Sequence, residues 1–281
     1  MFYLLNILIQ MKILLNNTSL FKSLRPFNDL GFVPTMGGIH KGHLSLINKS
    51  KKLCKKTVVS IFLNPKQFNN KKDLKSYPRN IEKDLKILKK TRKVDFVYLP
   101  KFKDIYKDNK KPKIVLNKKD KILCAKFRKG HFEGVLDVMN RLTKIINPTK
   151  IFMGEKDYQQ LYLVKNFLEK KYKTKIVSCK TIRDKNKIAL SSRNMLLDKS
   201  NLNTAGKIYK KLLNIRKIIY SQKDIFDFLK KQKKQLETDY RIKIDYLELR
   251  KKKDLKLTIK DNNSRLFIAY YLNKVRLIDN L

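Results

Sequence analysis

Short runs of β-branched and apolar residues alternate, through the first two thirds of the chain, with longer segments whose apolar positions recur at spacings of three and four. The short runs predict strands at residues 31–34, 57–63, 94–99, 113–116, 150–153 and 175–182. The longer segments predict helices at residues 43–55, 80–90, 132–146 and 158–171. This alternation favours an α/β fold of the Rossmann-like kind, a parallel sheet with helices on both faces. Ligands bind outside the carboxyl ends of such strands, so candidate chemistry is sought directly after each strand.

The remainder of the chain differs in composition, because seven of the eight glycines and all seven prolines lie at or before residue 154. From residue 183 the pattern predicts a loop and then two Lys-rich helices at residues 199–220 and 224–237. Two or three strands follow at residues 242–249, 265–271 and 275–278. We therefore expect two domains, residues 1–182 and a smaller α+β domain at residues 183–281.

The first fifteen residues are apolar but too short to cross a bilayer, and they lack a basic segment and a small-residue cleavage site. Residues 11–15 equally suit the first strand, which leaves residues 1–10 as an extension of unknown status. The three cysteines are far apart and outside any C-x-x-C spacing, so neither a disulfide framework nor a cysteine zinc site is expected. These features indicate a cytoplasmic protein with no membrane association.

The formal net charge is +44, from 68 Lys plus Arg against 24 Asp plus Glu. Such an excess is compatible with binding to nucleic acid or to an anionic membrane. Only 12 of the basic residues are arginine, however, and lysines occur in every segment rather than in one patch. No aromatic RNA-binding signature is present. We interpret the excess mainly as solvated lysine of compositional origin and expect no specific nucleic-acid partner.

The three histidines provide the first candidate chemistry. His40 and His43 follow the strand at residues 31–34 in VPTMGGIHKGH, at the start of a helix, and His131 lies in RKGHFEG. A strand, a glycine turn and a helix N-terminus together form an anion site, because unpaired backbone N–H groups point at the ligand. The alternatives are a solvent-facing pair or a zinc pair, and zinc needs further ligands that only His131 and scattered carboxylates could supply.

The H-x-G-H sequence after a strand resembles the signature of the HIGH-motif nucleotidyltransferases. The flanking segments narrow the resemblance to one family, because several long motifs in one order are far less expected by chance than any single motif. They are PTMGGIHKGH, then SIFLNPKQF at 60–68, YPRNIEKDL at 77–85, GHFEGV at 130–135, GEKDYQQL at 154–161 and LSSRN at 190–194. Over residues 30–198, and more weakly through the C-terminal LIDN, the sequence resembles the pantothenate synthetase (pantoate:β-alanine ligase) family.

The resemblance implies a cytoplasmic ATP-dependent, AMP-forming carbon–nitrogen ligase. ATP and pantoate would give pantoyl adenylate and pyrophosphate, and β-alanine would then displace AMP to give pantothenate, a precursor of coenzyme A. The first domain would bind the nucleotide and pantoate, and the second would cover the site. Family members are generally homodimers. The resemblance implies, besides a second copy of the chain, only the small-molecule partners pantoate, β-alanine and ATP.

Charge grows on the pyrophosphate and the α-phosphorus in the first step, so positioned donors and cations should dominate catalysis. The candidate catalytic residues are His43, which the family's assignment favours, with His40, Lys156 and Arg193. The residues that the resemblance assigns to ATP are Met36, Gly37, Gly38, Ile39, His40, Lys41, Gly42, His43, Gly154, Glu155, Lys156, Asp157, Ile182, Leu190, Ser191, Ser192 and Arg193. Residues 190–193 would form a phosphate clamp that orders when the nucleotide binds.

Gln67 and Gln160 match the family's pantoate-binding glutamines. An amide can donate to a carboxylate and accept from a hydroxyl, and pantoate presents both groups. The competing interpretation is that Gln67 closes a loop after Pro65 and that Gln160 is the surface half of a Gln-Gln pair. Mg²⁺ is expected because ATP enters as its Mg complex. Asp84 is the best candidate for a protein ligand of this ion. The alternative is that Asp84 is only solvated, as a carboxylate on an exposed helix more often is.

Three other functions deserve comparison. A phosphopantetheine adenylyltransferase would share H-x-G-H but would not need NPKQF, GEKDYQQ or the C-terminal domain. A tRNA-charging relative would suit the charge, yet no extension of anticodon-binding size is present. A basic nucleic-acid-binding protein with a degenerate enzyme fold would be retained on heparin and would lack pantoate-dependent AMP release. Because each motif position carries a competent side chain, the sequence favours an active enzyme.

Overall fold

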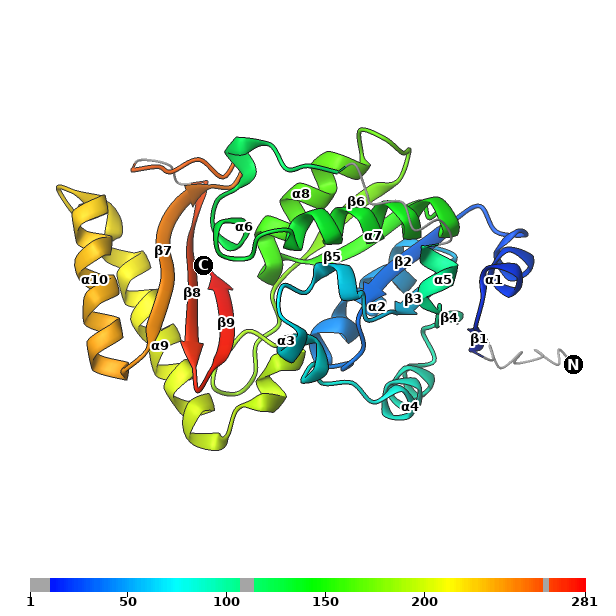
Figure 1. Ribbon diagram of the computed structural model, residues 1–281, viewed down its shortest axis with the longest axis horizontal. Coiled ribbons are helices and arrows are strands. Elements are labelled where there is room, and N and C mark those ends of the chain that lie inside the picture. The colour runs from blue at the N-terminus through cyan, green and yellow to red at the C-terminus, as the bar shows by residue number, and fades with distance from the viewer. Residues whose placement is uncertain (1–10, 107–113, 260–262) are drawn as a thin grey trace, which may run out of the picture.

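The structure is a computed structural model that describes residues 11–106, 114–259 and 263–281. Within them, six parallel strands form one sheet in the order β1-β4-β3-β2-β5-β6 (Figure 1). The strands are β1 Lys12–Leu14, β2 Leu30–Thr35, β3 Lys56–Ile61, β4 Phe96–Tyr98, β5 Lys150–Gly154 and β6 Lys175–Cys179. The helices that accompany them are α1 Asn17–Leu24, α2 Lys41–Leu53, α3 Lys71–Lys75, α4 Ile81–Thr91, α5 Phe102–Ile105, α6 Cys124–Phe127, α7 His131–Ile146 and α8 Tyr158–Leu168.

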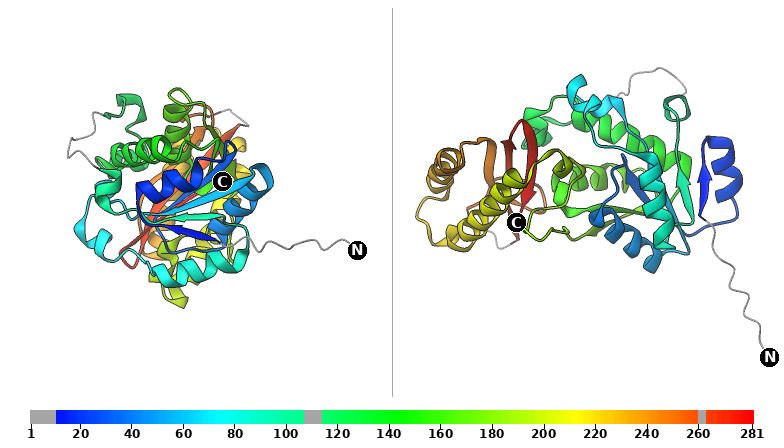
Figure 2. Two further views of the ribbon diagram at one scale, coloured as in Figure 1. Left: turned by 90° about the vertical axis from the view of Figure 1, so that its right-hand side faces the viewer. Right: turned by 90° about the horizontal axis from the view of Figure 1, so that it is seen from below.

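The inner strands β2, β3, β4 and β5 bury alternate residues on opposite faces, as the pleat requires. On β2, Phe32 joins the core beneath α1, α7 and α8, whereas Val33 joins the core beneath α2 and α4. Val58 and Val59 divide between the two cores in the same way on β3. In the left view of Figure 2 the green helices and the dark blue helix α1 lie on one side of the sheet, and the cyan helix α4 lies on the other. The sheet is thus buried on both faces, which explains its nearly continuous apolar runs.

Glycine permits the close approach of α2 to the sheet. A Cβ atom on Gly31 would lie 2.1 Å from Ser50 Oγ, so no side chain fits between β2 and the helix. Ser50 is buried there and its hydroxyl shares a 2.9 Å hydrogen bond with the hydroxyl of Thr57 on β3. The last turn of α2 is therefore held closely against the starts of β2 and β3.

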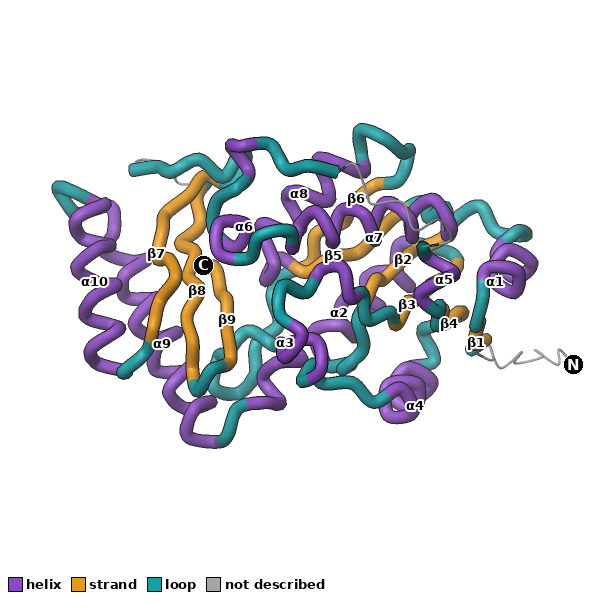
Figure 3. The backbone as a smooth tube through the Cα atoms, in the orientation of Figure 1, coloured by secondary structure: helices purple, strands orange, loops and turns teal. Residues whose placement is uncertain are grey.

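The C-terminal unit contains α9 Lys199–Ile218, α10 Ile225–Tyr240 and an antiparallel sheet of β7 Lys243–Lys251, β8 Ser264–Leu272 and β9 Val275–Asn280 in the order β7-β8-β9. Leu266 and Ile268 on β8 face a core shared with α9 and α10. Phe267 and Ala269 face the core of the first unit. The three strands consequently lie between their own two helices and the parallel sheet, as Figure 3 shows.

The predicted fold class is confirmed, a parallel sheet with helices on both faces and a smaller α+β unit. Several details of the sequence prediction are wrong. Residues 114–116 are irregular, and residue 113 lies outside the described residues, so no strand is seen at 113–116. Strand β6 ends at Cys179 rather than at residue 182, because the chain turns there into a loop closed by a bridge between Arg183 and Ala189. Helix α8 ends at Leu168 rather than at residue 171.

Candidate active site

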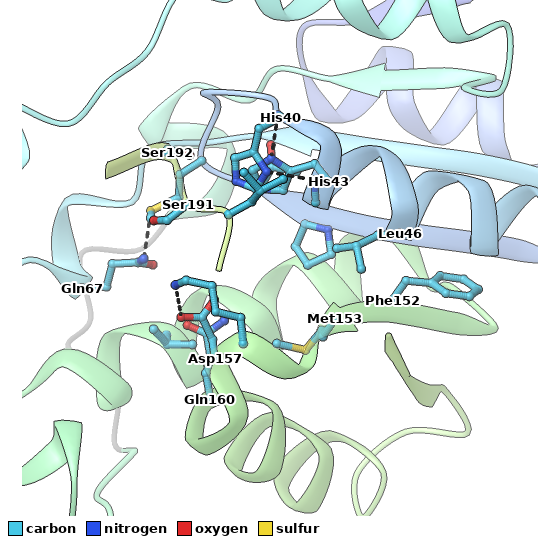
Figure 4. Close-up of a pocket in the computed structure, with 18 of the residues that line it drawn as sticks. His40, His43, Leu46, Gln67, Phe152, Met153, Asp157, Gln160, Ser191 and Ser192 are labelled. Carbon is cyan, nitrogen blue, oxygen red and sulfur yellow. Dashed lines mark hydrogen bonds and ion pairs between the residues drawn. The ribbon is translucent and has the colours of Figure 1, made fainter. Parts of the chain in front are cut away.

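The candidate site lies where the strand order of the parallel sheet reverses. From β2 the chain proceeds outward through β3 and β4, then returns to place β5 and β6 on the other side of β2. The connections after β2 and β5 therefore diverge and leave a crevice at the carboxyl ends of these two strands. A cavity of about 240 Å³ occupies this position. Figure 4 shows His40 and His43 on one wall, with Gln67, Asp157 and Gln160 on the others.

A glycine pair turns the chain between β2 and α2. Gly37 and Gly38 have φ values of +87° and +65°, a region that favours glycine. The carboxylate of Asp84, on α4, accepts hydrogen bonds from the backbone N–H groups of Gly38 at 2.8 Å and Ile39 at 2.7 Å. Asp84 is only 2% exposed, which corrects the expectation of a solvated carboxylate. The carboxylate thus holds the loop that leads to the histidines.

His40 and His43 form an unusual cap for α2. The Nδ1 atom of His40 accepts from the backbone N–H of Gly42 at 3.1 Å, and the Nδ1 atom of His43 accepts from the N–H of His40 at 3.4 Å. Because Nδ1 is an acceptor in both rings, the proton of each neutral imidazole is on Nε2. The helix accordingly begins at Lys41, two residues before the predicted start, since a ring nitrogen of His40 satisfies an N-terminal amide.

Both histidines are neutral in this environment. Burial, reinforced by the charge of Lys156, lowers the pKa of His40 to about 4. Burial, with the neighbouring His40 and Lys156, lowers the pKa of His43 to about 3. The two rings are stacked with their centroids 4.0 Å apart, so a proton on one ring would disfavour a proton on the other. The pair therefore presents two uncharged Nε2–H donors at the positive end of a helix.

Gln67 lies in the turn η1, Pro65–Gln67, which follows β3. Its side-chain nitrogen donates to Met36 Sδ at 2.9 Å, and its side-chain oxygen accepts from Asn64 Nδ2 at 3.2 Å. The wall of the cavity also includes Gln160, whereas the neighbouring Gln159 is buried and donates to the carbonyl of Ile122 at 2.7 Å. Of the Gln-Gln pair, only the second residue therefore faces the cavity.

His131 and Arg128 form a rigid pair beside Gln67. His131 Nδ1 lies 2.7 Å from the carbonyl oxygen of Gln67, which can only accept, so His131 carries its proton on Nδ1. Its Nε2 then accepts from Arg128 Nη1 at 2.9 Å. Burial and the adjacent guanidinium lower the pKa of His131 to about 3, which keeps the ring neutral and able to accept. Burial also lowers the pKa of Arg128 to about 10, so this guanidinium remains charged in the cavity at neutral pH.

Residues 154–157 pass from β5 into α8 through the turn η3, Glu155–Asp157. Lys156 lines the cavity and has its Nζ 3.4 Å from Asp157 Oδ1, a loose pair with the carboxylate half exposed. Glu155 turns away and binds Arg265 Nη2 of β8 at 2.6 Å. The structure therefore places Lys156 and Asp157 in the cavity wall and engages the side chain of Glu155 elsewhere.

The segment at residues 190–193 closes the cavity from the side of the C-terminal unit. Ser191 caps the turn η4, Ser192–Leu196, and the buried hydroxyl of Ser192 donates to the carbonyl of Gly38 at 3.1 Å. Arg193 binds Asp73 of α3 through Nη2 at 2.9 Å and through Nε at 3.4 Å. The expected phosphate clamp is thus in contact with both the glycine loop and α3.

The structure brings together most of the residues that the sequence predicted for ATP and pantoate. Those in the cavity wall are Met36, His40, Gly42, His43, Gln67, Gly154, Lys156, Asp157, Gln160, Ile182, Leu190, Ser191, Ser192 and Arg193. Those not in the wall are Gly37, Gly38, Ile39, Lys41, Glu155 and Asp84. Lys41 is exposed, whereas the other five support the loops from behind.

Sequence reasoning missed Asn64, which is 1% exposed. Its amide donates to Gln67 Oε1 and to the carbonyl of Gly134, both at 3.2 Å, and its oxygen accepts from Tyr106 Oη at 2.9 Å. Asn64 thereby fixes the orientation of Gln67. The Asn-Pro step after β3 was a usable signal for a turn, but two partners of Asn64, Tyr106 and Gly134, are distant in sequence.

Among the described residues, no group of three or more His, Cys, Asp and Glu side chains could hold a metal ion. The zinc alternative accordingly finds no ligand set there, and His131 is engaged with Gln67 and Arg128. The same part of the chain has no helix long and apolar enough to cross a membrane.

Known proteins resemble the chain over nearly its whole length. The family model described as pantoate-β-alanine ligase matches residues 11–281. A pantothenate synthetase of Flavobacterium psychrophilum is 39% identical over 268 residues, which cover 92% of this chain and 94% of the relative. One of Leptospira interrogans is 41% identical over 257 residues, with 90% of each chain covered.

Solved structures of the same kind of protein also superpose on this chain. A pantothenate synthetase of Thermus thermophilus superposes with a TM-score of 0.89 at 30% identity and covers 96% of this chain and 99% of its own. A pantoate-β-alanine ligase of Francisella tularensis, complexed with βγ ATP and β-alanine, superposes with a TM-score of 0.82 at 37% identity, covering 96% and 97%. Family model, relatives and fold thus agree, and the chain belongs to the pantoate-β-alanine ligase family.

Proposed function

We propose that the cavity at the carboxyl ends of β2 and β5 joins pantoate to β-alanine in two steps at the expense of ATP. A carboxylate oxygen of pantoate attacks the α-phosphorus of ATP, the bond between the α- and β-phosphates breaks, and pyrophosphate leaves. The amine of β-alanine then attacks the acyl carbon of pantoyl adenylate, loses a proton, and releases AMP with pantothenate. The observation that carries this proposal is the single cavity shared by two neutral histidines, Lys156, and the amides of Gln67 and Gln160.

His40, His43, Lys156 and Arg193 are the proposed catalytic residues of adenylation. Negative charge grows on the α-phosphate oxygens and on the departing pyrophosphate, so donors held in place before the reaction stabilise the transition state. The two Nε2–H groups remain fixed because their Nδ1 atoms are engaged with the backbone. Removing one such donor typically costs on the order of 3 to 4 kcal/mol of transition-state stabilisation.

The nucleotide site that we propose extends from the glycine loop through η3 to the clamp. Gly154 has no atom within 4 Å of a hypothetical Cβ, so the backbone there is open to a close ligand. Asp157, half exposed, suits the ribose hydroxyls, and Ile182 suits a backbone contact to adenine. Gly37, Gly38 and Ile39 would act by shaping the loop, and Glu155 by holding η3, rather than through contact of their side chains.

Pantoate would bind between Gln67 and Gln160. An amide nitrogen can donate to the carboxylate while an amide oxygen accepts from a hydroxyl. Met36 and Phe68 in the same wall provide apolar surface for the geminal methyl groups. Arg128, which His131 holds in the cavity, suits an anion that is either pyrophosphate or the carboxylate of β-alanine.

Mg²⁺ is proposed only as the ion that accompanies ATP. Asp84 does not fit the role of its protein ligand, because both carboxylate oxygens accept backbone N–H bonds behind the glycine loop. Mg²⁺ commonly keeps several waters and binds through substrate phosphates, which agrees with the lack of a carboxylate cluster among the described residues.

We also propose that residues 1–182 and 183–281 are separate domains with the active site between them, that the chain forms a homodimer, and that it acts in the cytoplasm. The separate sheets, and the core that α9 and α10 form with one face of the C-terminal sheet, support the division into domains. The dimer and the compartment are inferred from the family.

The decisive experiment measures AMP formed from ATP by the purified protein with pantoate and β-alanine together. Omitting β-alanine should leave pantoate-dependent exchange of labelled pyrophosphate into ATP, because adenylation is reversible and precedes amide formation. Well-folded protein without pantoate-dependent turnover would contradict the proposal. Retention on heparin in that same protein would favour a nucleic-acid-binding function instead.

A further inference from the structure

The last strand of the chain ends against the turn that carries Lys156. Asn280 is only 3% exposed, and its Nδ2 donates to the carbonyl oxygens of Glu155 at 2.9 Å and Lys156 at 2.8 Å. Its Oδ1 accepts from Arg265 Nη1 at 2.6 Å. Both N–H groups and the oxygen of this amide are therefore engaged, and an amide is required because only it both donates twice and accepts.

Arg265 completes this contact from β8. Its Nη2 binds the carboxylate of Glu155 at 2.6 Å, while Nη1 binds Asn280. Glu155 and the backbone of Lys156 are thus held together by neighbouring strands of the C-terminal sheet. This arrangement explains why the side chain of Glu155 points away from the cavity while the next residue, Lys156, lines it.

The neighbouring residue Asp279 holds the second loop of the site. Its carboxylate, with the residue 8% exposed, binds Arg183 in a fork, with Nη1 at 2.6 Å from one oxygen and Nη2 at 2.9 Å from the other. Arg183 pairs with Ala189 across the loop that precedes the clamp, and Leu190 N–H donates to the carbonyl of Ile182 at 2.9 Å. The loop leading to residues 190–193 is consequently anchored on the end of β9.

Two consecutive residues of β9 therefore connect two loops that leave neighbouring strands, β5 and β6, of the parallel sheet. Figure 1 shows β9 as the strand of the C-terminal sheet nearest to the first unit. One loop carries Lys156 and the other carries Arg193, the two cations proposed to bind the phosphates. The side chains of Asp279 and Asn280 thus link the two loops that carry these cations.

We propose that Asp279 and Asn280 are positioning residues for adenylation, which keep Lys156 and the clamp at the separation that the transition state requires. This inference rests on the proposed function. Catalytic cations stabilise a transition state best when they are held before the reaction, and a displacement of about 1 Å can cost about 100-fold in rate. A purely structural role at the interface would instead lower stability and affect all substrates alike.

The first test replaces Asn280 with aspartate, which has nearly the same shape but no N–H donor and sets negative oxygens against two carbonyls. Asn203→Asp, at an exposed position of α9, is the matched control. We expect Asn280→Asp to lower kcat of pantoate-dependent pyrophosphate exchange by about 10- to 100-fold with KM for pantoate unchanged. The control Asn203→Asp should have the same kcat and the same KM for pantoate as the original protein.

The second test concerns the clamp loop. Asp279→Asn should raise KM for ATP about tenfold or more, because the charged fork to Arg183 is lost. Asp239→Asn, on the exposed surface of α10, is the control. Adding Arg183→Gln to Asp279→Asn removes the unpaired buried cation, so we expect the melting temperature to recover while KM for ATP stays high.

Folding and positioning are separated by circular dichroism and melting temperature measured on each variant. Folded Asn280→Asp and Asp279→Asn proteins with unchanged kinetics would overturn the inference. A second result would also overturn it: the kinetic constants for ATP and for pantoate worsen equally, in step with the fall in melting temperature, and recover in the double variant. Original protein without any pantoate-dependent exchange would reject the proposed function itself, and this inference with it.

Discussion

The two histidines of the H-x-G-H sequence act, in this structure, as neutral donors whose tautomers are set by the backbone. A charged imidazole would attract phosphate more strongly, but it would need its pKa near or above 7. Burial and Lys156 keep the pKa of His40 at about 4 and burial, His40 and Lys156 keep that of His43 at about 3. Positive charge is instead supplied by the lysine and arginine side chains of the cavity wall.

Replacing His43 with alanine removes one Nε2–H donor and should lower kcat/KM for pantoate-dependent pyrophosphate exchange by about 100- to 1000-fold. The fold should survive, since the cap of α2 retains the bond from Gly42 to His40. Lys52→Ala, an exposed change on the same helix, is the control. Near-normal pyrophosphate exchange by folded His43→Ala protein would contradict the assignment of His43 as a catalytic donor.

Replacing Arg193 with lysine keeps the charge but loses the planar fork. Arg193 holds Asp73 through two of its nitrogens, and a phosphate needs further donors in fixed directions. We expect KM for ATP to rise about tenfold or more while KM for pantoate changes little. Arg25→Lys, at an exposed position, is the control. An unchanged KM for ATP would show that Arg193 contacts no phosphate.

The three histidines also predict how stability depends on pH. Their pKa values in the folded protein are about 4 for His40, 3 for His43 and 3 for His131, against 6.5 in the unfolded chain. Between pH 6.5 and about 4 the unfolded state binds protons that the folded state excludes, so the free energy of unfolding decreases as pH falls. Urea denaturation should give a lower midpoint at pH 5.5 than at pH 7.5.

The His131→Asn variant provides the comparison for that measurement. With one buried neutral histidine fewer, the loss of stability between pH 7.5 and pH 5.5 should be smaller than in the original protein. Equal losses in the two proteins would mean that His131 binds a proton in the folded state. Both proteins are compared above pH 5, where titration of the histidines dominates over that of carboxylates.

At the scale of elements, the pantoate side of the cavity depends on the close contact between α7 and the turn η1. A Cβ atom on Gly134 would lie 2.3 Å from the carbonyl oxygen of Lys66 and 2.9 Å from Gln67 Cα, both of them backbone atoms that cannot rotate away. The same helix begins with His131, which binds the carbonyl of Gln67. One helix thus supports Gln67 at two points.

Gly134→Ala should therefore push η1 away from α7. We expect a loss of about 1 to 3 kcal/mol in the free energy of unfolding, typical of overpacking, and a higher KM for pantoate because Gln67 moves with the turn. Gly154→Ala, where the added methyl group meets nothing within 4 Å, is the control for stability. Equal stability of the two variants would show that η1 accommodates the methyl group at little cost.

At the scale of the whole molecule, the net charge of +44 is the dominant feature. The described residues include eleven pairs in which a cation lies within 4.0 Å of a carboxylate, far too few to neutralise 68 basic side chains. Most lysines are solvated and repel one another. This repulsion opposes the compact state and is screened by salt.

Raising NaCl from about 20 mM to about 500 mM should raise the melting temperature, because the Debye length shrinks well below the spacing of most surface charges. The melting temperature is also measured in sucrose solutions of the same osmolality as the NaCl solutions. This control separates the screening of charge from the effect of a solute that is excluded from the protein surface. A flat or falling response to NaCl would contradict the view that the lysine excess destabilises the fold.

The sequence by itself determined the alternation of strands and helices, the glycine turn with its histidines, and the order of the long motifs. Those features are local, because hydrophobic period and turn residues act over a few positions. The predicted strand at 113–116 and the extension of β6 to residue 182 were wrong, because a β-branched run does not specify whether a neighbouring strand is available to pair with it.

Only the tertiary structure decided which side chains hold the site in place. Asp84 behind the glycine loop, Asp73 on Arg193, and Asn280 on the carbonyls of Glu155 and Lys156 are contacts between residues far apart in the chain. Their sequence signals are ordinary polar residues on a helix or at a strand end. What gives each its function is burial against one particular backbone group, and that depends on how the elements pack rather than on any local pattern.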